Sequence, residues 1–127
     1  MVRLRYRWIW LLLGWALVLL VTSASLTPGV ELPRVSFADK LAHAGAYFLL
    51  MIWFAGLYAR GRHVFVAAGL LALGATLEVI QGQLPYRMFD PLDMLANASG
   101  VAIGFGLSFW LLAGWCQRIE RRLGYHE

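Results

Sequence analysis

Two polar stretches carry most of the residues in this chain that could perform acid–base or binding chemistry. The first runs from Asp39 to Tyr47 and contains an aspartate, a lysine, a histidine and a tyrosine. The second runs from Glu78 to Gly100 and places three acids, an arginine and several amides between two long apolar runs. Ionisable groups at membrane depth cost about 2.5–3.5 kcal/mol each on insertion scales, and they tend to be functional. We therefore treat the two stretches as one candidate site.

Glu78 and His43 are the candidate catalytic residues. Glu78 lies near the C-terminal end of an expected helix over 64–82, where the helix dipole disfavours a negative charge. Neither capping nor solvation accounts for a carboxylate there, so it must be paired, protonated or bound to a cation. Arg87 is its expected partner, with His43 second. In a catalytic interpretation Glu78 acts as general acid or base and His43 assists it.

The other polar residues of the two stretches are candidates for substrate binding. Arg87 would bind a phosphate or a carboxylate through its planar guanidinium. The remaining candidates are Asp39, Asp90, Asp93, Gln81, Asn97 and Tyr47. Structural alternatives stay open, because Asp39 and Asp90 could each cap a helix and Asp93 could complement a helix dipole. Lys40 is expected only to extend towards the membrane surface.

No metal or other cofactor is predicted. The chain has a single cysteine, Cys116, which excludes a multi-cysteine metal site. No H-E-x-x-H motif or comparable spacing defines a ligand set. A divalent ion remains an alternative, because histidine and carboxylate ligands suit one. Its ligands would be Asp39, His43, Glu78 and Asp93.

The composition indicates a membrane protein with one domain. The chain has 127 residues, of which 61% are hydrophobic and 14% are charged, whereas a soluble domain carries about 25% charged residues. This length permits one small domain, 1–127, and no second domain. The formal net charge of +4 does not indicate a nucleic-acid partner, because the arginines lie in short clusters beside apolar runs. Membrane lipids are the expected partners.

Four apolar runs predict four transmembrane helices, over about 8–26, 40–59, 64–82 and 91–115. These lengths are close to the roughly 20 residues that span a hydrocarbon core, or exceed them. A cleaved signal peptide is the alternative for the first run, but that run is longer than a usual signal core. The tail that follows is short, polar and basic. The predicted fold is an all-α, integral membrane four-helix bundle.

The basic residues predict how these helices are oriented. Eight would share a face with the N-terminus: Arg3, Arg5, Arg7, Arg60, Arg62, Arg118, Arg121 and Arg122. Three would lie on the opposite face: Arg34, Lys40 and Arg87. By the positive-inside rule both termini are cytoplasmic, so both polar stretches face outward. His63 then lies on the basic face, where we expect it to be solvated.

Two further patterns concern packing. Small residues recur every four positions on the last span, at Ala96, Gly100, Gly104 and Ser108. Such a seam lets another helix approach closely, and we expect that helix to belong to the same bundle. Five tryptophans are expected to anchor the bundle at the membrane interfaces or to face lipid: Trp8, Trp10, Trp53, Trp110 and Trp115.

Three motifs in order give the chain a family resemblance. They are D-K-x-x-H-x-x-x-Y from Asp39, E-x-x-Q from Glu78, and R-x-F-D-x-x-D-x-x-x-N-x-x-G from Arg87. This series resembles the VanZ-like family of small integral membrane proteins, over about residues 39–104. Members often have glycine before the arginine, where this chain has Tyr86. The resemblance implies a bacterial cytoplasmic membrane, a role in the cell envelope and tolerance of the glycopeptide antibiotic teicoplanin.

Two functions follow from these expectations. The first is an enzyme that acts on an envelope lipid or a lipid-linked precursor. The second is a non-catalytic protein that binds a lipid head group, an antibiotic or a partner protein. Whether the chain is an enzyme stays open, since no G-x-S-x-G or metalloprotease motif is present. A self-contained channel is disfavoured, because the polar groups are confined to the outer third of the bundle.

Overall fold

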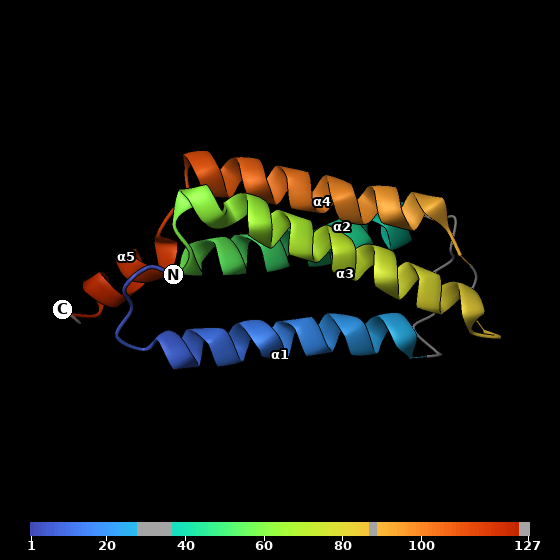
Figure 1. Cartoon of the computed structure of the whole chain (residues 1–127), viewed down its shortest axis with the longest axis horizontal. Helices are drawn as coiled ribbons and strands as arrows, with labels where there is room; N and C mark the ends of the chain where they lie inside the picture. Colours follow the sequence, from blue (N-terminus) through green and yellow to red (C-terminus); the bar gives the residue numbers. More distant parts are fainter. Residues whose placement is uncertain (28–36, 87–88, 125–127) are drawn as a thin grey trace.

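The computed structural model describes residues 1–27, 37–86 and 89–124, and this part of the chain is helical throughout apart from turns and short connections (Figure 1). The helices are α1 (Arg7–Leu26), α2 (Phe37–Leu57), α3 (His63–Gln83), α4 (Pro91–Trp110) and α5 (Trp115–Arg122), with a 3₁₀ turn, η1 (Arg60–Arg62), before α3. Four of them, α1 to α4, are long and apolar enough to cross a membrane. The prediction of an all-helical chain with four such helices is confirmed.

The last predicted helix is shorter than expected. It ends at Trp110 rather than near 115, and the basic tail forms the separate helix α5. The break lies at Gly114, whose φ of 67° belongs to the left-handed region that glycine adopts without steric cost. The hydropathy pattern missed this break because Leu111 to Ala113 are apolar and give no stop signal.

The second predicted helix begins earlier than expected. It starts at Phe37 instead of Lys40, so Asp39 lies within its first turn. A carboxylate in that position complements the helix dipole. Asp90 behaves as the cap alternative predicted, because its side chain accepts a hydrogen bond from the Leu92 N–H and Pro91 follows it.

The closest helix pair in the bundle is α2 with α4, and small residues explain it. A Cβ atom on Gly100 would overlap the backbone of Ala44, and one on Gly104 would meet Met51 and the Phe48 carbonyl. The glycine seam on the last span therefore packs within the bundle, as predicted. This close approach brings the N-terminal turns of α2 and α4 together at one end, which we call the polar end.

The opposite end, the basic end, holds the N-terminal residues and α5 (Figure 1). Trp10, Trp53 and Trp115 form a cluster there, with ring centroids 5.5–5.6 Å apart. These three tryptophans are partly buried against one another, whereas Trp8 and Trp110 are exposed, and the expected anchoring at membrane interfaces stays a prediction. The cluster forms because α5 folds back against the start of α1, and the short, polar and basic character expected of the tail did not indicate this contact.

His63 also departs from the prediction. It is fully buried, not solvated, and its Nε2 lies 3.0 Å from the Ala55 carbonyl oxygen and 3.1 Å from that of Tyr58. An imidazole N–H that donates to these carbonyls satisfies backbone acceptors at the C-terminal end of α2. His63 thus closes the turn between α2 and α3.

Candidate functional site at the polar end

Lys40 is the centre of the polar end. Its Nζ donates to Asp93 Oδ1 at 2.5 Å, to Asp90 Oδ2 at 2.7 Å and to Asp39 Oδ2 at 3.3 Å. The ammonium has three protons, one for each carboxylate. Asp39 lies on α2, Asp93 lies on α4, and Asp90 is the residue that caps α4. The expectation that Lys40 merely extends to the membrane surface was wrong. Its partners lie up to 53 positions away in the sequence, so only the packing of α2 on α4 reveals them.

His43 lies one helical turn further along α2. Its Nδ1 is 3.2 Å from Asn97 Oδ1, and its Nε2 is 3.6 Å from Asp93 Oδ2 and 3.8 Å from Asp39 Oδ1. Asp39 and Asp93 therefore each place one oxygen near Lys40 and the other near His43. An imidazole that is oriented by an amide on one nitrogen and flanked by carboxylates on the other is well placed to exchange a proton.

Glu78 lies beside this network but is not part of the wall of the pocket described below. Its side chain is 1% exposed, and its Oε1 accepts a hydrogen bond from the Asp90 N–H at 2.6 Å. This contact ties the C-terminal part of α3 to the residue that begins α4. Arg87, its expected partner, lies outside the described residues. The structure thus gives Glu78 a positioning contact, and the general acid or base role predicted for it stays a prediction.

Asp90 combines two tasks at the same place. It caps α4 through Oδ1 and receives Lys40 through Oδ2. The hydrogen bond from Lys40 is the main reason that the pKa of the Asp90 carboxyl lies below its ordinary value, and the bond from Leu92 acts in the same direction. The carboxylate therefore stays charged and keeps Lys40 in position.

The three remaining predicted residues line or support the site from within the bundle. Gln81 Nε2 donates to the Ser25 carbonyl at 2.6 Å and so joins α3 to α1. Tyr47 and Asn97 are buried, and both pack against the backbone at Gly74, where a Cβ would meet the Asn97 amide at 3.2 Å and the Tyr47 ring at 3.3 Å. A glycine at position 74 is what allows these two side chains to reach α3.

A small pocket of about 190 Å³ opens beside these groups. Asp39, His43, Tyr47 and Gln81 form its polar wall. The facing wall comes from α1, where Leu20, Val21, Ala24 and Ser25 line it. Four of the nine predicted site residues therefore meet in one pocket that is polar on one side and mostly apolar on the other. A small polar group carried on an apolar chain matches both walls.

The same side chains could hold a divalent ion. Asp39, His43 and Asp93 each offer one ligand atom, and these atoms all lie within 4.8 Å of one another. The contact between His43 and Asn97 is the kind of second interaction that orients a histidine ligand. Glu78, the fourth ligand considered from the sequence, has its Oε1 on the Asp90 N–H. The three-residue set suits an ion that accepts nitrogen and oxygen ligands.

The chain is similar to a fungal protein. An uncharacterized protein of Schizosaccharomyces pombe is 32% identical over 96 residues, which is 72% of this chain and 59% of the fungal protein. The chain thus spans about three fifths of that relative, whose name assigns no activity. No protein-family model matches the chain, and no solved structure matches it significantly. The resemblance to the VanZ-like family therefore stays a prediction.

Proposed function

We propose that this chain is a multi-pass membrane protein of the VanZ-like type, with both termini in the cytoplasm and the polar end at the outer face of a bacterial cytoplasmic membrane. Four helices of sufficient length and apolar character support the membrane placement. The orientation is supported by arginines at the basic end, among them Arg60 and Arg62 before α3 and Arg118 on α5. As a VanZ-like protein it would act in the cell envelope and favour tolerance of teicoplanin.

We further propose that the pocket at the polar end binds an envelope lipid or lipid-linked precursor through an amine on its head group. The observation that carries this proposal is the charge beside the pocket. Asp39 in the pocket wall, together with Asp90 and Asp93, gathers three carboxylates around Lys40 beside the pocket. A protonated amine would be attracted to Asp39 in the pocket wall, and the start of its apolar chain would contact α1. Arg87 would bind the phosphate, as the sequence predicts.

Native mass spectrometry of the full chain in detergent tests this proposal with two probes that differ only in the amine. Phosphatidylethanolamine carries N–H donors, whereas phosphatidylcholine carries methyl groups in their place. We expect the ethanolamine lipid to bind at least about tenfold more tightly, since a hydrogen bond to a charged group contributes about 1.5–3 kcal/mol. Asp39→Asn should remove this preference, and Ser99→Ala, on the exposed face of α4, should keep it.

Equal binding of the two lipids by the wild type would contradict the proposal. The same spectra separate the binding function from catalysis, which remains a second candidate because His43 is oriented for proton transfer. Catalysis would change the mass of the bound lipid over time. His43→Gln would abolish that change and keep the lipid bound, whereas a binding protein would leave the mass of the lipid constant in both forms.

A further inference from the structure

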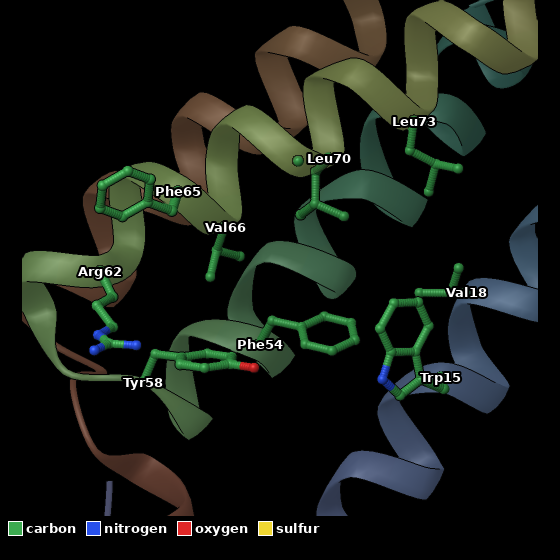
Figure 2. Close-up of a pocket in the computed structure, with 10 residues that line it drawn as sticks. Trp15, Val18, Phe54, Tyr58, Arg62, Phe65, Val66, Leu70 and Leu73 are labelled. Atoms are coloured by element: carbon green, nitrogen blue, oxygen red, sulfur yellow. The ribbon is translucent and has the colours of Figure 1, made fainter. Parts of the chain in front are cut away.

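A second and larger cavity lies towards the basic end, away from the site described above. It is a groove of about 750 Å³ between α1, α2 and α3. Figure 2 shows side chains of all three helices around it. Its apolar lining consists mainly of Trp15, Val18, Phe54, Val66, Leu70 and Leu73. Pockets that bind small molecules span about 300–1,000 Å³ and are mostly apolar, so this groove has the size and character of a binding site.

The groove exists because α1 packs loosely. Gly14 is its one buried residue, and a Cβ there would come within 2.9 Å of the Trp53 ring. The groove lies between the middle of α1 and the first half of α3, and the two helices meet nearer the polar end, where Gln81 donates to the Ser25 carbonyl. In its apolar stretch 6% of α1 is buried inside the protein, against 28% for the span that contains α3. The helix thus offers a long apolar face that the described protein does not cover.

One end of the groove carries a positive charge. Arg62 lines it together with Tyr58, and Figure 2 shows the two side chains next to each other at that end. The guanidinium of Arg62 makes no hydrogen bond or ion pair with any residue in the described ranges. The neighbouring Arg60 differs, because its guanidinium lies over the Phe109 ring at 5.7 Å. Arg62 is therefore a cation at the mouth of an apolar groove, and no acid lines that groove.

We propose that the groove binds an anionic phospholipid of the surrounding membrane, with its phosphate at Arg62 and one acyl chain along the apolar lining. Charge and shape both select this occupant, because an anionic head group complements Arg62 and an acyl chain fills a narrow apolar space. In the proposed orientation Arg62 lies at the cytoplasmic leaflet, where anionic lipids meet basic residues. The inference rests on the membrane placement proposed above and is independent of the chemistry at the polar end.

Filling the groove tests the position of the acyl chain. Gly69 lines the groove, and a Cβ there would have no atom within 4 Å, so Gly69→Leu begins a side chain in open space beside the groove. Gly106 on α4 is equally open and does not line the groove, which makes Gly106→Leu the matched control. In native mass spectra with added phosphatidylglycerol, the wild type and Gly106→Leu should each retain one tightly bound lipid. Gly69→Leu should bind it about tenfold more weakly.

Removing the charge tests the position of the phosphate. Arg62→Gln should reduce the preference for phosphatidylglycerol over phosphatidylcholine by about fivefold, because a basic residue near a membrane surface contributes about that factor. Arg60→Gln removes the same charge outside the groove and should keep the preference. Equal lipid retention by wild type and Gly69→Leu would overturn the groove as the site, and equal effects of the two arginine variants would overturn the role of Arg62.

The two proposals can fail separately. Phosphatidylglycerol probes Gly69 and Arg62 at one end, whereas phosphatidylethanolamine probes Asp39 at the other. One outcome is that the wild type shows no preference for phosphatidylethanolamine while Gly69→Leu still binds phosphatidylglycerol more weakly than the wild type does. That outcome would refute the head-group function and leave the groove proposal intact. The reverse result would refute the groove alone.

Discussion

Carboxylates are stabilised in different ways at the two ends of the bundle. At the basic end Glu120 accepts three neutral donors: the Arg5 N–H at 2.8 Å, the Tyr6 N–H at 3.0 Å and the Trp10 indole N–H at 2.9 Å. At the polar end three aspartates share the ammonium of Lys40. The first arrangement uses three uncharged N–H donors, and the second uses one lysine ammonium that three carboxylates share.

The difference indicates which end can change partners. Glu120 is 6% exposed and both of its carboxylate oxygens accept hydrogen bonds, so it links α5 to the start of the chain. The aspartates are partly exposed, they outnumber their lysine, and one of them lines a pocket. We therefore place ligand chemistry there and a structural role at Glu120.

Removing the Glu120 carboxylate should have the largest effect on stability. Glu120→Ala leaves three donors without their acceptor, and each lost partner of this kind costs about 1–3 kcal/mol. Water reaches part of the site after the change, so we expect a loss of about 3 kcal/mol in the free energy of unfolding. Thermal unfolding followed by tryptophan fluorescence measures it, because Trp10 belongs to the cluster that α5 holds together. Glu120→Gln keeps one acceptor oxygen and should lose less.

A loss of less than about 1 kcal/mol in Glu120→Ala would contradict the structural role. Lipid binding at the polar end should stay unchanged in any folded Glu120 variant, because the two ends share no contact through this residue.

Removing the Lys40 ammonium should have an intermediate effect on stability. Lys40→Met leaves three carboxylates close together without the ammonium that they share, and we expect a loss of about 2 kcal/mol in the free energy of unfolding, since the group is partly exposed. The double variant Lys40→Met with Asp93→Asn removes one of the repelling charges and should recover part of this loss. A double variant no more stable than Lys40→Met would show that the carboxylates do not repel one another there. Chemical denaturation in mixed micelles gives both values.

The dependence of stability on pH should be the smallest effect. Burial alone would raise the pKa of Glu120, but the N–H groups of Tyr6, Arg5 and Trp10 outweigh it and hold that pKa below its ordinary value. The folded state thus binds this proton less readily than the unfolded state, whose glutamate pKa is about 4.3. The stabilisation is fully present above that value and is lost as the pH falls through the lower folded pKa.

Measuring the unfolding midpoint at several pH values between 7 and 3 checks whether stability falls as the pH falls. Wild type should lose stability in the acid range, and Glu120→Gln should lose less, because the neutral amide has no proton to take up. An identical slope in the two proteins would assign the acid sensitivity to other carboxyls, of which Asp90 is the first candidate since its pKa is also lowered.

Much of the fold follows from local features of the sequence. The four apolar runs predict the four long helices because a segment must be about 20 residues long and apolar to cross a membrane. Asp90 followed by Pro91 predicts the start of α4, since a cap acts on N–H groups two residues away. Gly100 and Gly104 predict a close helix contact because they lack side chains. Each signal depends on neighbours within one or two turns.

The candidate site was predictable as a set of residues but not as an arrangement. The motifs named Asp39, His43, Tyr47 and Gln81, which meet in one pocket. They did not reveal that Lys40 is shared by three aspartates, or that Glu78 contacts the Asp90 backbone. Except for Lys40 and its neighbour Asp39, those pairs join residues that are separated by at least 12 positions in the sequence. The distance between such groups depends on how the helices pack.

The sequence by itself therefore determined the number of membrane-length helices, the helix start at Asp90 and the identity of the polar set, because hydropathy and capping act locally along a chain. The tertiary structure decided which of those polar groups touch. It also decided that His63 is buried, that α5 returns to the N-terminus through Glu120, and that a groove remains between α1 and α3. The physical reason is that contacts between helices depend on the volumes of facing side chains, such as Gly100 against Ala44 and Gly14 against Trp53.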